Sequence, residues 1–258
     1  MDDDTILVTG ATGGLGREVL ARARRTGRPV RALTRRAALP DDPGVAWFTG
    51  DLTTGASLDA AFAGAGTVIH CASDTRHPKH DIPGFHHLLA AAERGGTRHI
   101  VNISIVGVDR IPYGYYRVKL EGERLLAASG TGWTNLRATQ FPELLDKAFT
   151  VLSRLPVMLV PAGALCQPVD RGEVADRLVE LALEAPAGRV PDLAGPVVQR
   201  LDRMAAGWLR AAGKRRPVLA VPLPGKLGAG LRAGALTSPA RAVGRRTWEQ
   251  YLAGKASR

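Results

Sequence analysis

A tyrosine and a lysine stand four residues apart in Tyr115-Tyr116-Arg117-Val118-Lys119, so a helix would carry Tyr115 and Lys119 on one face. A nearby ammonium favours the ionised form of a tyrosine. Such a tyrosine can donate a proton to a carbonyl oxygen as a hydride reaches the carbon, and the lysine can hold ribose hydroxyls. The segment therefore predicts a catalytic pair, with Tyr115 as the general acid.

A glycine-rich turn, Thr9-Gly10-Ala11-Thr12-Gly13-Gly14-Leu15-Gly16, lies between a predicted strand at 5–9 and a predicted helix at 16–28. Gly10 permits a tight turn, Gly13 lets the backbone approach a pyrophosphate, and Gly16 lets helix and strand pack closely. The helix N-terminus offers N–H groups and the positive end of its dipole to phosphates. The predicted cofactor contacts here are Gly10, Thr12, Gly13, Gly14, Leu15 and Gly16.

The next predicted strand, at 30–34, is followed by Arg35 and Arg36. In sites for NAD an acidic residue stands about 20 residues after the glycine loop and binds the ribose 2′-hydroxyl. No acid occupies that place here, and a guanidinium pairs well with the 2′-phosphate of NADP. Arg35 and Arg36 therefore predict NADP(H) as the cofactor, although an arginine-rich chain can also carry such a pair as plain surface residues.

Two further loops are predicted to border the cofactor. Asp51, in Gly50-Asp51-Leu52 after the third predicted strand, can accept a hydrogen bond from the adenine amino group, and a plain turn aspartate is nearly as good an interpretation. We expect contacts from Asp51 and Leu52. The loop after the fourth predicted strand should border the nicotinamide, with cofactor contacts from Cys71, Ala72 and Ser73 and substrate contacts from His77 and His80.

Strands and helices alternate along the first 141 residues. The predicted strands are 5–9, 30–34, 45–48, 67–70, 99–104 and 133–137, and the predicted helices are 16–28, 57–62, 82–94 and 115–128. This alternation predicts an α/β fold with a doubly wound parallel sheet of the Rossmann type.

The alternation loosens after residue 141. Helices are expected at 143–152, 172–183, 201–212 and 241–252, with short strands near 157–160 and 218–221. We expect an NADP(H)-binding core at 1–141 and a smaller C-terminal α/β substrate region at 142–258, packed as a single structural unit. The second region should cover the carboxyl ends of the strands, where ligands of such sheets bind.

All six histidines lie within residues 70–99, close to Cys71, which raises the possibility of a metal site. The segment from His77 to His80 is interrupted by Pro78, and His86 and His87 would point to different faces of a helix. We therefore expect no metal site.

The chain of 258 residues has a formal net charge of +11. Residues 201–258 hold twelve lysines and arginines against two acidic residues. Such a region can attract nucleic acid, an anionic membrane or an anionic ligand, or can simply be solvated surface. No nucleic-acid-binding motif accompanies it, so no nucleic-acid partner is expected, and attraction of NADPH is the preferred functional hypothesis.

Compartment and assembly are also constrained. No apolar run reaches about 18 residues, so we expect no membrane association. Cys71 and Cys166 form no disulfide framework, and the acidic start does not resemble a secretory signal. A reducing cytoplasm is expected, with a monomer or homodimer that acts on a small molecule.

Several motifs together resemble one family. They are TGATGGLG (9–16), GDL (50–52), HIVNISIVGVD (99–109), YYRVK (115–119) and WTNLRATQF (133–141), and less distinctively QPVDRGEVADRLVELAL (167–183). Over nearly its whole length the chain resembles atypical short-chain dehydrogenases/reductases of the NmrA-like, NAD(P)H-binding branch. The resemblance implies a Rossmann domain, a small C-terminal substrate region, NADP(H), and the site residues Gly10, Gly13, Gly16, Arg35, Asp51, Tyr115 and Lys119.

One position departs from that family. Short-chain dehydrogenases commonly carry a catalytic serine after the fifth strand, often the second of a Ser-Ser pair, whereas here Ile105 follows Ser104. Ser104 is the candidate for orienting the carbonyl, and Gln140 and Phe141 are expected to contact substrate. The predicted function is NADPH-dependent reduction of a carbonyl or conjugated small molecule, aromatic compounds among them. The alternative is a non-catalytic redox sensor that binds NADP(H) and regulates a protein partner.

Overall fold

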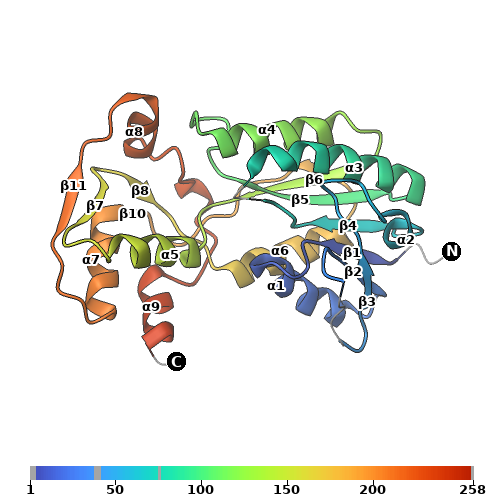
Figure 1. Cartoon of the computed structure of the whole chain (residues 1–258), viewed down its shortest axis with the longest axis horizontal. Coiled ribbons are helices and arrows are strands. Elements are labelled where there is room, and N and C mark those ends of the chain that lie inside the picture. The colour runs from blue at the N-terminus through green and yellow to red at the C-terminus, as the bar shows by residue number, and fades with distance from the viewer. Residues whose placement is uncertain (1–3, 38–41, 75–76, 257–258) are drawn as a thin grey trace. The chain divides into compact units, whose positions relative to one another are not determined.

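A parallel β-sheet organises most of the N-terminal half of the chain (Figure 1). The computed structural model describes residues 4–37, 42–74 and 77–256. Within these residues seven strands form one sheet in the order β3-β2-β1-β4-β5-β6-β9. The strands are β1 (Ile6–Thr9), β2 (Val30–Thr34), β3 (Ala46–Thr49), β4 (Thr67–His70), β5 (His99–Ile105), β6 (Gly132–Ala138) and β9 (Gly188–Arg189).

The strand order reverses between β1 and β4. β1 pairs in parallel with β2 and with β4, while β2 pairs with β3, β4 with β5, and β6 with β9. In open α/β sheets ligands bind beyond the carboxyl ends of the strands at such a reversal. The predicted doubly wound parallel sheet is confirmed, and its switch point follows Thr9 and His70, which are register partners.

Helices cover both faces of this sheet, with α3 and α4 on one face and α1 and α6 on the other (Figure 1). The helical segments here are α1 (Gly14–Ala23), η1 (Arg24–Thr26), α2 (Asp59–Phe62), η2 (Pro78–His80), α3 (Asp81–Gly95), α4 (Gly114–Ala127) and α6 (Arg171–Leu183). Their apolar faces explain the packing, because α1 buries Gly16, Val19, Leu20 and Ala23 at helical spacing. The shared core includes Leu7, Val68 and Ile100 from the strands and Phe62, Phe85, Leu88 and Leu126 from the helices.

The chain divides into two compact units, each assembled from separate segments. Unit 1 comprises Met1–Ser104, Arg117–Leu136 and Val174–Val190. Unit 2 comprises Ile105–Tyr116, Arg137–Glu173 and Pro191–Arg258. The predicted division of domains at residue 141 stays a prediction.

Unit 2 has its own core. Its remaining elements are α5 (Pro142–Leu152), β7 (Met158–Pro161), β8 (Leu165–Cys166), β10 (Gln199–Arg200), α7 (Leu201–Ala211), β11 (Val218–Val221), α8 (Gly225–Arg232), η3 (Pro239–Arg241) and α9 (Trp248–Ala256). The rings of Phe149, Trp208 and Trp248 pack together between α5, α7 and α9. The carboxylate of Asp146 accepts hydrogen bonds from Trp208 and Lys255, which joins the same three helices.

The helix expected at 241–252 is wrong over its first half, because α9 begins only at Trp248. The backbone N–H of Gly244 donates to the carbonyl of Ala194 at 2.9 Å, and that of Arg245 donates to the Glu173 carboxylate at 2.9 Å. These donors therefore serve distant segments and cannot form helical i→i−4 bonds.

Among the described residues, no helix is both long and apolar enough to cross a membrane.

Candidate functional site

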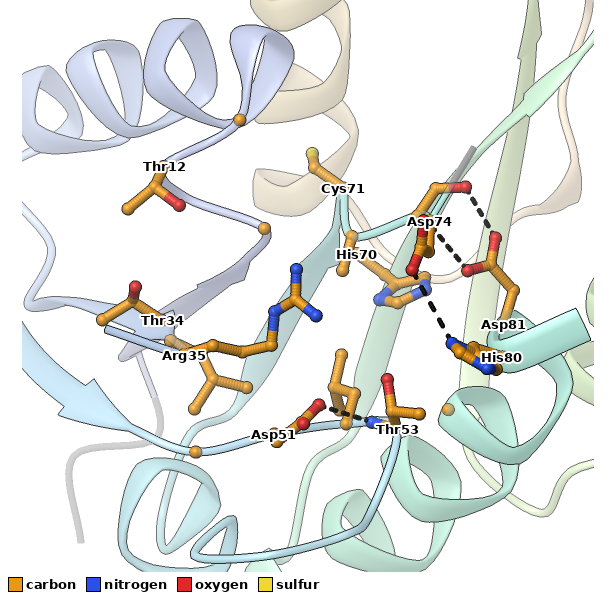
Figure 2. A pocket seen from close by; sticks show the side chains of 18 residues that line it. Thr12, Thr34, Arg35, Asp51, Thr53, His70, Cys71, Asp74, His80 and Asp81 are labelled. Atoms are coloured by element: carbon orange, nitrogen blue, oxygen red, sulfur yellow. Dashed lines mark hydrogen bonds and ion pairs between the residues drawn. The ribbon is translucent and has the colours of Figure 1, made fainter. Parts of the chain in front are cut away.

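A pocket in unit 1 lies at the strand-order reversal, and a volume of about 220 Å³ within it is open to water-sized molecules (Figure 2). The loops after β1, β2, β3 and β4 and the start of α3 line it. The lining residues predicted from the sequence are Gly10, Thr12, Gly13, Arg35, Asp51, Leu52, Cys71, Ala72, Ser73 and His80. Residues that the sequence did not single out are Leu33, Thr34, Gly50, Thr53, His70, Asp74, Asp81 and Gly84.

The glycine loop is shaped by contacts that a side chain would block. Gly10 has a φ of +68°, and a Cβ there would lie 2.6 Å from the backbone nitrogen of Ala72. A Cβ on Gly16 would overlap the carbonyl oxygen of Gly10, which is the close helix–strand packing expected from the sequence. The loops after β1 and β4 therefore touch through backbone alone.

The N-terminus of α1 is suited to an anion. Its N-cap is Gly13, which has no side chain that could cap the first N–H groups, and no acidic residue lies in the first turn. The first N–H groups of a helix have no partner within the helix, and its dipole favours negative charge there. This loop and helix therefore fit a pyrophosphate. Gly14 and Leu15 belong to the same first turn but do not line the pocket.

Arginines gather on the side of the site next to β2. Figure 2 shows the Arg35 side chain pointing into the pocket. Arg36 instead lines a neighbouring hollow of about 340 Å³ together with Thr12, Arg17 and Arg24. Arg24 is paired with Asp42 at 2.7 Å, whereas Arg17, Arg35 and Arg36 form no ion pair with a residue that the structure describes. Sequence reasoning missed Arg17, although its place directly after Gly16, at the start of the helix, was visible.

Two carboxylates hold the loops that frame the pocket. Asp51 accepts the backbone N–H of Thr53 at 2.8 Å, which fixes the turn after β3. Asp81, at the start of α3, accepts the hydroxyl of Ser73 at 2.6 Å and the backbone N–H of Asp74 at 2.7 Å. The loop after β4 is thus tied to α3, as Figure 2 shows for Asp74 and Asp81.

Lys119, in α4, is buried, with 4% of its surface exposed. Burial and the Lys119 ammonium lower the pKa of His70 to about 3, so this imidazole is neutral at pH 7. Its Nδ1 lies 2.8 Å from the Thr9 hydroxyl. Burial also raises the pKa of Cys71 to about 12, although the ammonium acts in the opposite direction. Lys119 does not line the pocket itself, but it lies within electrostatic range of His70 and Cys71, which do.

The predicted catalytic tyrosine lies one turn before Lys119 in α4 and is half-buried. Its neighbour Tyr116 packs against a cluster formed by Ile111, Ala235 and Leu236. Burial, together with nearby tyrosines and Cys166, raises the pKa of Tyr116 to about 12. Tyr116 is therefore a packing residue in unit 2 and a poor proton donor.

Ser104, in β5, is 3% exposed, and its hydroxyl has no hydrogen-bond partner among the described residues. A buried hydroxyl without a partner costs about 1–3 kcal/mol. A buried group of this kind calls for an explanation, and a catalytic role is one of those that apply.

Of the four residues expected to contact substrate, His80 lines the pocket, whereas Gln140 and Phe141 belong to unit 2. His77 lies directly before η2. The Gln140 amide donates to the carbonyl of Leu236 at 2.8 Å, and its oxygen accepts the N–H of Gln167 at 3.3 Å. Phe141 is the N-cap residue of α5. Both ends of the Gln140 side chain are thus engaged within unit 2.

A doubly wound sheet with a glycine-rich loop at its switch point and arginines after β2 defines a Rossmann-type dinucleotide-binding protein. The chain belongs to the NAD(P)H-binding family, whose model matches residues 10–185. This result confirms the predicted resemblance to atypical short-chain dehydrogenases/reductases and the prediction of a nicotinamide dinucleotide cofactor.

Solved structures agree on the fold. The NADPH complex of the NADPH-dependent quinone oxidoreductase QOR2 from Escherichia coli has a TM-score of 0.80 and 21% identity, covering 97% of this chain and 99% of that one. The triphenylmethane reductase of Citrobacter sp. in complex with NADP(H) has a TM-score of 0.76 and 20% identity, covering 98% and 99%.

Curated relatives match over shorter stretches. A (4-alkanoyl-5-oxo-2,5-dihydrofuran-3-yl)methyl phosphate reductase of Streptomyces griseus is 35% identical over 53% of this chain and 48% of its own length. Quinone oxidoreductase 2 of Escherichia coli is 27% identical over 81% of this chain and 75% of its own length. This chain spans about half the length of the first of these relatives.

Proposed function

We propose that this protein is an NADPH-dependent reductase of a carbonyl or conjugated small molecule, aromatic compounds among them. The single observation that carries the proposal is the position of Lys119. A buried ammonium is costly unless it is compensated, and this one acts electrostatically on His70 and Cys71, which line the dinucleotide pocket. A lysine in that position suits the ribose hydroxyls of a dinucleotide.

The pocket fits NADP(H) at each of its parts. The loop from Gly10 to Gly13 and the start of α1 would hold the pyrophosphate, and Asp51 would accept from the adenine amino group. Arg35 would pair with the 2′-phosphate, with Arg17 and Arg36 adding positive charge nearby. No described acidic residue stands at the end of β2, where an NAD site has one.

The chemistry assigned to this chain is proton donation. Bound NADPH supplies the hydride. Tyr115 donates its hydroxyl proton to the substrate oxygen while the carbon gains hydrogen, so that a C–H and an O–H bond form. Lys119, one turn along α4, stabilises the resulting tyrosinate. Ser104, whose buried hydroxyl has no partner among the described residues, would orient the carbonyl.

The relatives favour a conjugated or carbonyl substrate. Besides quinone oxidoreductase 2, they include a divinyl chlorophyllide a 8-vinyl-reductase of rice, 30% identical over 75% of this chain and 55% of its own length. The chemistry that these names share is reduction of a conjugated double bond or a quinone carbonyl.

The experiment is a screen for NADPH consumption with quinones, enones and aromatic carbonyl compounds, followed by a comparison of Tyr115→Phe with Tyr116→Phe. The two variants make the same change in adjacent residues, and only the first removes the assigned proton donor. Turnover that survives Tyr115→Phe, or falls equally in both variants, would contradict the assignment.

A redox sensor is the alternative, and the sequence Ser104-Ile105 favours it because the second serine common in these enzymes is absent. A sensor binds NADP(H) without consuming it. Tight NADPH binding, with no oxidation of NADPH by any compound of the substrate panel, would therefore favour the redox sensor over the reductase.

A further inference from the structure

Three potential metal ligands converge at the rim of the pocket, in the loop between β4 and α3. The Oδ2 atom of Asp74 lies 3.4 Å from Nδ1 of His77 and 3.7 Å from Nδ1 of His80. The two imidazole rings are stacked, with centroids 5.3 Å apart and planes inclined by 23°. One ligand atom from each of the three residues lies within 4.8 Å of the others.

The local backbone explains why these side chains meet. Pro78 is the first residue of η2, and the N–H of His80 donates to the carbonyl of His77 at 2.9 Å. A 3-10 helix has about three residues per turn, so side chains at i and i+3 lie one above the other. The expectation that Pro78 separates His77 from His80 is therefore wrong, because proline is well suited to the first position of a helical turn.

The carboxylate is oriented as a ligand would need. The backbone N–H of Asp74 donates to Asp81, which anchors the loop to α3. The other carboxylate oxygen of Asp74, Oδ1, accepts the backbone N–H of His77 at 3.0 Å. The Oδ2 atom is consequently turned toward both imidazoles, as Figure 2 shows for His80.

The separations are compatible with metal coordination. The Oδ2 atom of Asp74 and Nδ1 of His77 form a long hydrogen bond of 3.4 Å, and Nδ1 of His80 lies 3.7 Å from the same oxygen, beyond hydrogen-bond range. Zinc binds nitrogen at about 2.0–2.1 Å and oxygen at about 2.0–2.2 Å in a tetrahedron, which places neighbouring ligand atoms about 3.3 Å apart. The three ligand atoms here lie within 4.8 Å of one another, so the two exposed imidazoles must rotate out of their stacked arrangement to close on an ion. The side chains of His77 and His80 are 65% and 50% exposed, so an ion can enter and keep a water or a ligand.

We propose that Asp74, His77 and His80 form a binding site for a divalent transition-metal ion, with Zn²⁺ as the best match for two imidazoles and one carboxylate. The fourth position stays open to water or to an oxygen of a bound molecule. Because Asp74 and His80 also line the pocket, the ion lies at the pocket rim. The site goes beyond the proposed reductase, which does not require it.

Calorimetric titration of tag-free, NADPH-free protein with Zn²⁺ tests the proposal, and Co²⁺ absorption reports the coordination geometry. We expect about one ion per chain and a tetrahedral Co²⁺ spectrum. The variants His77→Ala and His80→Ala should each weaken binding by at least about tenfold, because removing a ligand should cost no less than the roughly 10–100-fold that loss of an outer-shell partner costs. The control is His86→Ala, which removes an exposed histidine of α3 outside the cluster and should bind as wild type does.

Circular dichroism of each variant checks that the fold is retained. Absence of Zn²⁺ binding, or equal binding by the wild type and His77→Ala, would overturn the metal site. The titration contains no NADPH or substrate, so neither result bears on the proposed reductase activity. Loss of activity in the reductase assay, in turn, does not bear on the metal site.

Discussion

Replacing Gly10 by alanine should damage stability and cofactor binding through two separable effects. The first is conformational, because Gly10 has a φ of +68°, and a left-handed conformation costs an L-residue about 1–2 kcal/mol. The second is steric, since the new Cβ would lie 2.6 Å from the nitrogen and 2.7 Å from the Cα of Ala72. Ordinary contacts are about 3.5 Å, so two backbone segments must separate by nearly 1 Å, which costs about 1–3 kcal/mol more.

The matched control is Gly27→Ala. Gly27 has a φ of +77°, and no atom lies within 4 Å of the place that its new methyl group would occupy. Denaturant unfolding followed by circular dichroism should show a loss of about 1 kcal/mol for the control and about 3 kcal/mol for Gly10→Ala. NADPH titration should show weaker binding only for Gly10→Ala, because only there do two pocket loops move apart. Equal losses of stability with unchanged NADPH affinity would refute the close approach of the loops after β1 and β4.

Three further predictions follow from the same site. Arg35→Ala should weaken NADPH binding by about 2 kcal/mol, as loss of a charged hydrogen-bond partner does, and leave NADH binding nearly unchanged; equal effects in calorimetry on both cofactors would contradict its role. Tyr115→Phe should keep NADPH binding and lower kcat by about 10²–10⁴-fold, while Tyr116→Phe should retain most activity in the same steady-state assay. In the folded protein the pKa of His70 is about 3, below its ordinary value of 6.5. Protonation of this imidazole therefore favours the unfolded chain, so the free energy of unfolding should be full above pH 6.5 and should fall as the pH drops toward 3. The slope of unfolding free energy against pH should be shallower in His70→Gln, and an unchanged slope would exclude His70 as its source.

Much of the sheet could be predicted from the sequence. The strands Val30–Thr34, Thr67–His70 and Val218–Val221 begin and end where expected, because short apolar, β-branched runs are bounded by polar or turn residues. The glycine loop was equally visible, since the roles of Gly10 and Gly16 depend on positions a few residues apart. Features of this kind are local, so spacing along the chain is enough to reveal them.

Other features required distant partners. The helix expected at 241–252 has a suitable local pattern, but the N–H groups of Gly244 and Arg245 bond to Ala194 and to Glu173 instead. The edge strand β9 has only two residues, Gly188 and Arg189, and exists through its pairing with β6. Neither feature is encoded by periodicity, because each depends on which donors and acceptors the fold brings near.

The site shows the same distinction. The sequence by itself determined that a dinucleotide loop, a pair of arginines after β2 and a Tyr-x-x-x-Lys helix occur in one chain. Only the tertiary structure decided that Lys119 lies near His70, that Arg17 joins Arg36 at one hollow, and that His77 and His80 face the same oxygen of Asp74. The physical reason is that electrostatic and coordination geometry depend on distances in space, which folding sets both between residues far apart in the chain and, through the turn at η2, between near neighbours such as His77 and His80.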